Sequence, residues 1–243
     1  MTVACFVRGA AAFEGDARTL RPAILPPMLR RRTSPLSRAV AEVLGRLADA
    51  TGADLGRLPI VHATSHGEIG VTVALLAAVL DPDGDVSPTR FHNSVHNTAC
   101  GYVSIACGNR AGHTTLAAGP DTAAMALVEA AARLATGDGD VLVVCADEPV
   151  PPPLPPRPPA AVTAAAFHLA AARPGARLVL EGPAAPDPRD ARAGTPAEAA
   201  AALAHAITSR RPGPVVLSSL GPFDGDGGHV YRAALSFAPT DPP

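Results

Sequence analysis

Cys100 is the residue of this chain best placed to do covalent chemistry. It stands in the run His96-Asn97-Thr98-Ala99-Cys100-Gly101, and the small residues that follow it as far as Gly108 predict a buried helix. A cysteine in the first turn of a helix lies at the positive end of the helix dipole, which favours its thiolate. The pattern predicts a thiol able to accept an acyl group by thioester exchange, although a small core cysteine has the same appearance in sequence.

A metal site is the other chemistry that these residues could support. His92, His96 and Cys100 recur every four residues, as ligands on one helix face would. Pro88 and the Asn, Ser and Thr residues near His92 favour a loop there, and no carboxylate joins the three. We therefore expect no metal and no cofactor. His168 lies in an apolar stretch, which favours a hydrogen-bonded core histidine.

The elements that must position Cys100 alternate between apolar strands and alanine-rich helices. Ser34 and Pro35 predict an N-cap and the first residue of a helix. The further elements expected up to residue 148 are a strand at 58–61, a helix from His66 to Leu80, a strand at 114–118, a helix from Gly119 to Gly137 and a strand at 140–148.

The second half of the chain contains further strands and one strongly capped helix. Residues 162–169 and 177–181 are expected to be two strands paired with each other, and Thr195-Pro196-Ala197-Glu198 is a capping box at a helix start. Strands at 214–219 and 227–235 are joined by a turn rich in Gly and Asp. The Pro-rich segment at 150–160 predicts an extended surface loop.

Composition sets the class of the protein. The chain has 243 residues, of which 47% are hydrophobic and 3% aromatic, so it can bury a substantial core in which alanine and glycine do much of the packing. The alternating elements predict an α/β fold with layers, and we expect residues 1–243 to be a single domain.

Charge and cysteine usage exclude several functions. The 20 basic and 22 acidic residues nearly balance, and no basic stripe with interleaved aromatics occurs, so nucleic acid is not an expected partner. All the basic residues are arginine, which excludes a Schiff-base lysine. No run approaches the roughly 18 apolar residues of a spanning helix, so we expect no membrane partner and a cytoplasmic location. The cysteines show no CxxC spacing and are expected to be reduced.

The order of these segments resembles the N-terminal half of a β-ketoacyl synthase of the thiolase superfamily. Thr98-Ala99-Cys100 matches the family's nucleophile run, which sits at a strand-to-helix elbow. The other matching segments are the helix and strand at 39–60, the loop with Ser87-Pro88-Thr89 and Asn93-Ser94-Val95, and the strand at 114–119. The resemblance implies a thiolase-like layered α/β/α half.

The chain also departs from the complete family pattern. A complete ketosynthase is much longer, and its second half supplies two histidines that stabilise the charges of condensation. No His-Gly-Thr-Gly-Thr motif occurs in this chain. Because condensation needs fixed donors for the developing negative charge, Cys100 could at most hold an acyl group, and we expect it to be dispensable for condensation.

Truncated relatives of this kind resemble the chain-length-factor subunits that pair with a full-length ketosynthase in reducing type II polyketide systems, including those that make polyenes. The resemblance implies a non-catalytic subunit that covers the far end of the partner's acyl tunnel, with the acyl carrier protein bound mainly by the partner. It also implies that one strand pairs antiparallel with its counterpart in the partner. The residues of that strand are Thr114, Thr115, Leu116, Ala117 and Ala118.

Four other residues receive roles from the resemblance. Tyr102, Met125 and Leu127 are expected to affect product length through the tunnel. His229 stands in a glycine-rich stretch similar to the family's closing hairpin, which would bring it near the site.

A second function remains open at this stage. The chain could be a self-sufficient, Cys100-dependent acyltransferase, ketosynthase or thioesterase acting on thioesters of an acyl carrier protein, with His96 or His229 as an activating group. No complete acid/base set can be assembled from the matched positions, which favours the partner-subunit interpretation.

Overall fold

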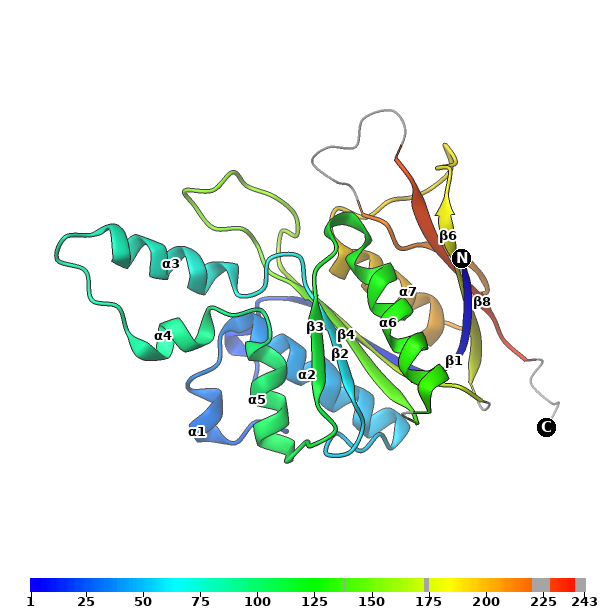
Figure 1. The fold of residues 1–243 in the computed structure, drawn as a ribbon, viewed down its shortest axis with the longest axis horizontal. Helices are drawn as coiled ribbons and strands as arrows, with labels where there is room; N and C mark the ends of the chain where they lie inside the picture. The colour runs from blue at the N-terminus through cyan, green and yellow to red at the C-terminus, as the bar shows by residue number, and fades with distance from the viewer. Residues whose placement is uncertain (138, 173–174, 220–227, 239–243) are drawn as a thin grey trace.

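Eight strands of this chain form one mixed sheet in the computed structural model, in the order β3-β2-β4-β5-β1-β6-β8-β7 (Figure 1). The structure describes residues 1–137, 139–172, 175–219 and 228–238. The strands are β1 (Thr2–Gly15), β2 (Ile60–Ala63), β3 (His113–Leu116), β4 (Val141–Asp147), β5 (Val162–Ala170), β6 (Ala176–Ala184), β7 (Gly213–Val216) and β8 (Val230–Ser236).

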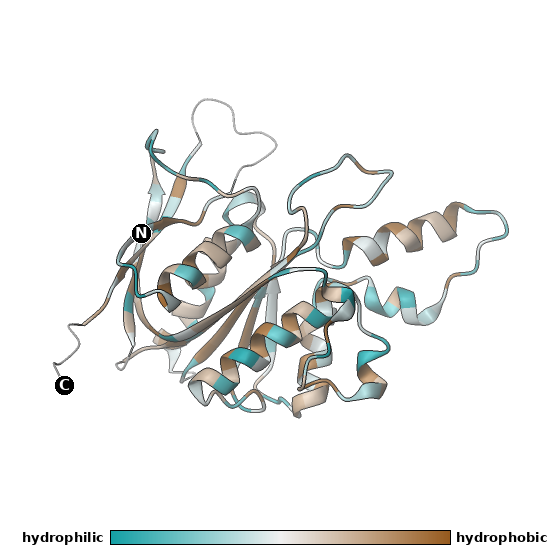
Figure 2. Ribbon diagram, turned by 180° about the vertical axis from the view of Figure 1, so that it is seen from behind, coloured by the Kyte–Doolittle hydropathy of each residue, from teal (hydrophilic) through white to brown (hydrophobic). Residues whose placement is uncertain are grey.

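Helices cover both faces of this sheet (Figures 1 and 2). α2 and α5 pack on one face, and α6 and α7 pack on the other. The helices are α1 (Pro27–Arg30), α2 (Pro35–Thr51), α3 (Ile69–Leu80), α4 (Pro88–Asn93), α5 (Thr98–Cys107), α6 (Thr122–Thr136) and α7 (Pro196–Thr208), with 3₁₀ turns η1 (Ala17–Thr19) and η2 (Gly119–Asp121). The predicted layered α/β/α arrangement is confirmed.

β2, β3 and β4 are parallel neighbours, and their carboxyl ends lie side by side. Ligands of open α/β folds bind at the carboxyl ends of such strands, because the connections leave a crevice there. The strand β5 reverses direction beside β4, and all later pairings in the sheet are antiparallel.

The pairing predicted for residues 162–169 and 177–181 is wrong. β1 lies between β5 and β6 and pairs antiparallel with both. Its 14 residues are long enough to pair with β6 through Thr2–Val7 and with β5 through Phe6–Gly15. The prediction paired two strands that are consecutive in the sequence, because consecutive strands usually lie next to each other. In this sheet the N-terminal strand β1 separates them.

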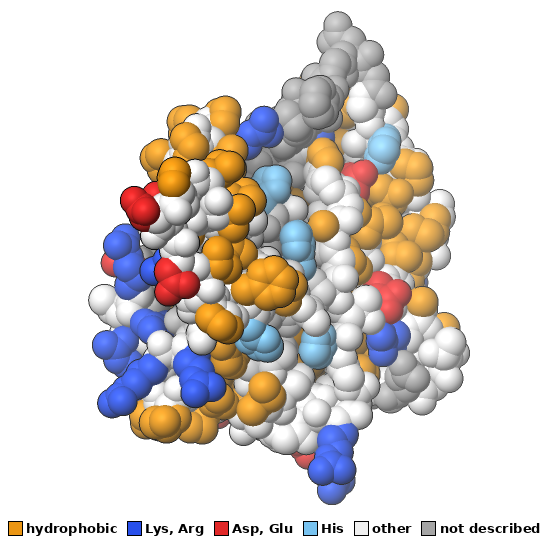
Figure 3. Space-filling view, turned by 60° about the vertical axis from the view of Figure 1, so that its left-hand side comes forward, with side chains coloured by type: hydrophobic (Ala, Val, Ile, Leu, Met, Phe, Trp, Pro, Cys, Tyr) orange, Lys and Arg blue, Asp and Glu red, His pale blue; other side chains and the backbone are white. Residues whose placement is uncertain are grey.

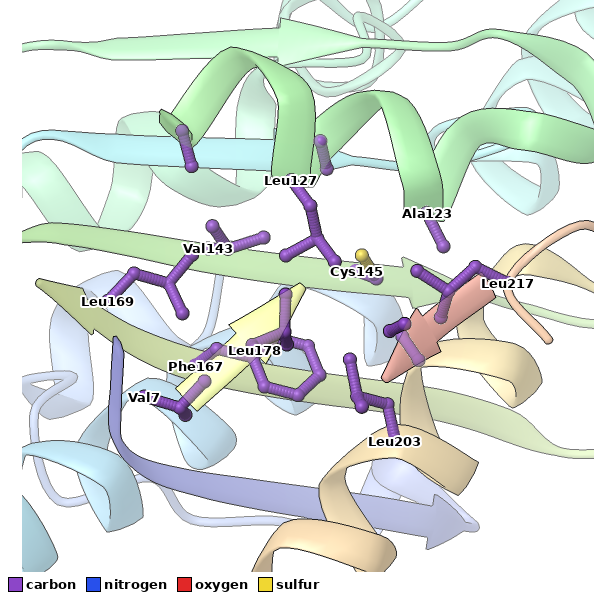
Figure 4. Packing of buried hydrophobic residues seen from close by; sticks show 14 of the residues in the cluster. Val7, Ala123, Leu127, Val143, Cys145, Phe167, Leu169, Leu178, Leu203 and Leu217 are labelled. Atoms are coloured by element: carbon purple, nitrogen blue, oxygen red, sulfur yellow. The ribbon is translucent and has the colours of Figure 1, made fainter. Parts of the chain in front are cut away.

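The two helical layers enclose two hydrophobic clusters, one on each face of the sheet. Figure 4 shows the α6/α7 side, where Leu127 and Leu203 point toward Phe167 and Cys145 on the sheet. Many of the buried helix positions are alanine, which lets α6 and α7 lie close to the strands. The low aromatic content of the chain is thereby accommodated.

Caps determine where the two best-predicted helices begin. Ser34 accepts a hydrogen bond from the N–H of Ser37 at the start of α2 (2.9 Å). Thr195 and Glu198 form the predicted capping box of α7, each side chain bonding the other's backbone N–H. Both helix starts are therefore confirmed.

One segment differs from the predicted loop. Residues 88–93 form the short helix α4, because Pro88 occupies the first helical turn, where its missing N–H has no role. α3 and α4 together project from the body of the molecule as a helical hairpin (Figure 1). We call residues 69–93 the arm.

Candidate functional site

Cys100 lies inside α5 and not at a strand-to-helix elbow. α5 follows α4 through a short turn, and Cys100 is fully buried in the cluster between α2 and the sheet. Burial raises the pKa of its thiol to about 12, which outweighs the helix dipole. The expectation of a favoured thiolate at Cys100 is therefore wrong: at neutral pH the group is a protonated core thiol.

The tight strand-to-helix elbow of this fold joins β3 to α6. Gly119 adopts a left-handed backbone (φ +55°), which a side chain would disfavour, and Pro120 and Asp121 complete the turn. The Thr122 hydroxyl accepts from the N–H of Ala118 and donates to the carbonyl of Gly119, both at 2.8 Å. The elbow thus presents Pro120, which carries neither a thiol nor a hydroxyl.

A cavity of about 440 Å³ lies beside the elbow, at the carboxyl ends of the parallel strands. Its walls come from the segments after β2, β3 and β4, from the Pro-rich loop and from the start of α7. The lining residues are Ser65, His66, Gly67, Ile69, Gly119, Pro120, Asp147, Glu148, Arg157, Pro158, Pro159, Gly194, Thr195, Pro196 and Ser219.

Two carboxyl groups at the end of β4 are the principal ionisable groups of this cavity. Asp147 is buried and accepts from the N–H groups of Ser65 (2.7 Å) and Ala197 (3.1 Å). Burial nevertheless raises its pKa. Burial raises the pKa of Glu148 to about 7, although its carboxyl accepts a hydrogen bond from the N–H of Gly70 (2.8 Å), which acts to lower the pKa. Glu148 can therefore exchange a proton near neutral pH.

Neither Asp147 nor Glu148 is among the site residues predicted from the sequence. The available signal was their place directly at the end of a predicted buried strand, where polar residues often line a site. Glu68 belongs to the same acidic group: its carboxyl accepts from the Ser37 hydroxyl (2.6 Å), and burial raises its pKa.

His229 reaches the elbow region. Its Nε2 lies 2.8 Å from the Asp121 carboxylate, and the Ser218 hydroxyl donates to the other oxygen of that carboxylate at 2.5 Å. The imidazole is largely exposed and stacks edge-on against Tyr231. His229 therefore contacts the elbow and not Cys100. Residues 220–227, which include the start of the predicted last strand, lie outside the described part of the chain.

The three residues assigned to the tunnel do not meet. Tyr102 is buried on α5, where its hydroxyl donates to the Asn93 side chain at 2.8 Å. Leu127 on α6 is buried in the cluster on the opposite face of the sheet (Figure 4). Met125 is partly buried and packs against the same cluster. The sheet separates Tyr102 from the other two residues.

The expected interface strand lies at one edge of the sheet. β3 covers His113–Leu116, so Ala117 and Ala118 follow it in the elbow. The carbonyl of Gly112 accepts from the N–H of Ile60 on β2, and the carbonyl of Leu116 accepts from the N–H of Thr64 just after β2. This register leaves the backbone groups of His113 and Thr115 facing the open edge. Both lack a described strand partner on that side.

The other edge of the sheet is protected. In the β7–β8 register, Gly213 and Val215 face β8, so Pro214 faces outward, and proline has no N–H to offer a further strand. The β3 edge keeps both of its outward-facing N–H groups, those of His113 and Thr115, whereas the β7 edge lacks one at Pro214.

A buried histidine lies beside this edge. His62 on β2 is fully buried, and neither of its ring nitrogens has a hydrogen-bond partner among the described residues. The hydroxyl of Thr115, its register partner on β3, is also buried and unpaired. Burial, with His113 and His96 nearby, lowers the pKa of His62 to about 4, so the ring is neutral at pH 7.

The described residues contain no group of three or more His, Cys, Asp or Glu side chains arranged to hold a metal ion. None of their helices is long and apolar enough to cross a membrane. His92, His96 and Cys100 lie in α4, in the following turn and in α5, and do not share one helix face.

Comparison with known proteins gives one family. A family profile described as "Beta-ketoacyl synthase, N-terminal domain" matches residues 8–211. No curated protein sequence matches the chain.

Solved structures share the fold. A chain of the complex titled ketosynthase (ApeO) with its chain length factor (ApeC), from Xenorhabdus doucetiae, is similar with a TM-score of 0.68 at 20% identity, over 97% of this chain and 100% of that chain. A β-ketoacyl synthase from Burkholderia phymatum STM815 has a TM-score of 0.52 at 16% identity, over 71% of this chain and 60% of that one.

A third structure is AntDE:AntF, a type II polyketide synthase acyl-carrier protein with its ketosynthase bound to the hexaketide. Its TM-score is 0.52 at 14% identity, over 68% of this chain and 62% of that one. The chain thus spans about three fifths of these last two relatives. The predicted thiolase-like fold is confirmed.

Proposed function

Because the chain belongs to the β-ketoacyl synthase N-terminal domain family, we propose that it is a non-catalytic, chain-length-factor-like subunit that pairs with a ketosynthase in type II polyketide chain elongation. The observation that carries this proposal is the elbow between β3 and α6. The resemblance puts the family's nucleophile at a strand-to-helix elbow, and this elbow presents Pro120.

The remaining groups around the elbow support the same conclusion. Asp147, Glu148 and His66 could move protons, but proton transfer without a nucleophile does not form an acyl-enzyme. The thiol of Cys100 is protonated and buried in the opposite cluster, so it does not replace the missing nucleophile.

The two sheet edges support pairing with another subunit. Pro214 removes a donor from the β7 edge, whereas the backbone N–H and C=O groups of His113 and Thr115 face outward at the β3 edge without a described strand partner. An unprotected edge strand readily accepts a further strand. The similar structure from Xenorhabdus doucetiae is a complex of a ketosynthase with its chain length factor, and we extend that arrangement to this chain.

In this arrangement the partner performs the condensation and is the main binding partner of the acyl carrier protein, while this chain closes the far end of the partner's acyl tunnel. A growing apolar chain stops where a further methylene would overpack a dense interior. Because the sheet separates Tyr102 from Met125 and Leu127, a single tunnel can be lined either by Tyr102 or by Met125 and Leu127, but not by all three residues.

The test is reconstitution of chain elongation with a ketosynthase, its carrier protein and either this chain or its Cys100→Ala variant. We expect equal product formation with both versions and none when the partner's own catalytic cysteine is replaced. Transfer of an acyl group to the isolated chain at Cys100, or loss of elongation in Cys100→Ala at unchanged stability, would instead establish the acyltransferase alternative.

A further inference from the structure

The arm carries a helix that is apolar on every side. α3 contains no charged residue, yet Leu75 is its one buried position among residues 69–80, and Figure 2 shows its hydrophobic colouring continuing around the projecting helix. Val79 is 61% exposed and Leu80 is 81% exposed. A helix that is hydrophobic all round belongs in a buried environment, and this chain does not provide one.

The root of the arm is held firmly. The Glu148 carboxyl accepts from the N–H of Gly70 at 2.8 Å, and the Glu68 carboxyl is bonded by the Ser37 hydroxyl at 2.6 Å. A Cβ at Gly67 would come within 2.9 Å of the His96 ring, so the turn into α3 is tightly packed. The body therefore presents the arm in a fixed direction, which lowers the entropy that binding must overcome.

The exposed apolar residues of the arm continue onto α5 and reach the β3 edge. Ser104 on α5 lies 3.4 Å from the His113 ring on β3, which places the outer side of α5 next to that edge. Figure 3 shows hydrophobic side chains and histidines spread over this face. The members of this arm surface are Leu76, Val79, Leu80, Phe91, Val95 and Ile105.

The size of a stable interface explains why the arm surface is needed. A lasting protein interface buries about 800 Å² on each partner, and four residues of β3 supply only a small part of that area. The arm surface adds large exposed apolar side chains to the area that β3 offers. A partner paired with β3 therefore needs further contact area for a stable interface, and the arm surface can supply it.

Charge adds a second feature of the partner. The loop at the tip of the arm carries Asp81, Asp83 and Asp85, all exposed and without an ion pair to any described residue. A partner groove that receives an acidic tip is complementary when its far end is basic.

We propose that the arm inserts into an apolar groove of the ketosynthase subunit, with α3 buried between the subunits and its acidic tip against basic residues of that groove. This inference rests on the proposed function and specifies its partner surface. It makes the arm, and not β3 alone, the main source of affinity.

The experiment measures the dissociation constant of the complex with the ketosynthase for the unmodified chain, a Val79→Ser/Leu80→Ser double variant and a Met28→Ser control. Met28, on α1 outside the arm surface, is also highly exposed (68%). We expect the control to bind like the unmodified chain and the double variant to bind at least about tenfold more weakly. The urea midpoints of the three free chains should agree, because the replaced side chains are exposed.

Hydrogen exchange provides a second readout, in which residues 69–80 should gain protection in the complex. If the unmodified chain binds and the double variant binds equally well, the arm inference fails and the proposed function stands. If the unmodified chain does not bind a ketosynthase, both fail. Arm-dependent self-association, or arm-dependent binding to phosphatidylglycerol vesicles, in place of ketosynthase binding would likewise overturn the inference.

Discussion

His62 makes a quantitative prediction about stability and pH. The ring is fully buried on β2 with both nitrogens unpaired, and its pKa is lowered to about 4 from an ordinary value near 6.5. Folding therefore excludes a proton that the unfolded chain binds readily in acid. His62→Leu isolates the effect of this proton on stability, because it replaces the imidazole with an apolar side chain of similar size that cannot bind a proton.

The sign follows from the direction of the shift. A histidine whose pKa is lowered by folding contributes nothing unfavourable above pH 6.5 and costs stability as the pH falls through the window from 6.5 to 4. The free energy of unfolding should fall by about 2 kcal/mol between pH 7 and pH 5, and by about 3 kcal/mol at pH 4, from this group alone.

Buried carboxyl groups act in the opposite direction and must be separated from this effect. The raised pKa values of Asp147, Glu148 and Glu68 mean that protonation of these groups favours the folded state as the pH falls. Comparison of the unmodified chain with the variant removes their contribution, because both chains contain the same carboxyl groups.

The assay is urea unfolding at pH 7 and pH 5 for the unmodified chain, His62→Leu and a control, His205→Gln, which replaces an exposed histidine on α7. The difference in unfolding free energy between the unmodified chain and His62→Leu should change by about 2 kcal/mol between the two pH values, whereas the control should follow the unmodified chain. An identical pH dependence in His62→Leu and the unmodified chain would show that the buried His62 ring does not destabilise the folded chain in acid.

Two further changes test the β3 edge and the acidic group of the cavity. Thr115→Pro removes an N–H that faces the open edge and should abolish the complex with a ketosynthase in size-exclusion chromatography. Thr115→Val keeps the N–H and should still form the complex. Equal complex formation by both variants would exclude strand pairing at β3. Asp147→Asn places an amide where two carboxyl oxygens accept backbone N–H groups and should lower the unfolding free energy in urea by about 1–3 kcal/mol, with the exposed Asp49→Asn as the control that should leave it unchanged; an unchanged value for Asp147→Asn would contradict the described bonds.

Features that depend on residues close together in the chain could be predicted from the sequence. Ser34-Pro35 and the capping box at Thr195 locate helix starts because the cap and the N–H groups it satisfies lie within one turn of each other. The alternation of apolar strands and alanine-rich helices indicated an α/β protein, and the order of the segments was sufficient to indicate the ketosynthase family.

Features that depend on contacts between residues far apart in the chain could not be predicted from local patterns. β1 joins the sheet between β5 and β6, a pairing that no local pattern encodes. The strand-to-helix elbow is formed by Gly119 and Pro120, between β3 and α6. The Thr98-Ala99-Cys100 run is not an elbow, because the element before α5 is the helix α4 and not a strand. Local position predicted a reactive thiolate at Cys100, whereas packing against α2 and the sheet buries the thiol, and its desolvation is a larger effect than the helix dipole.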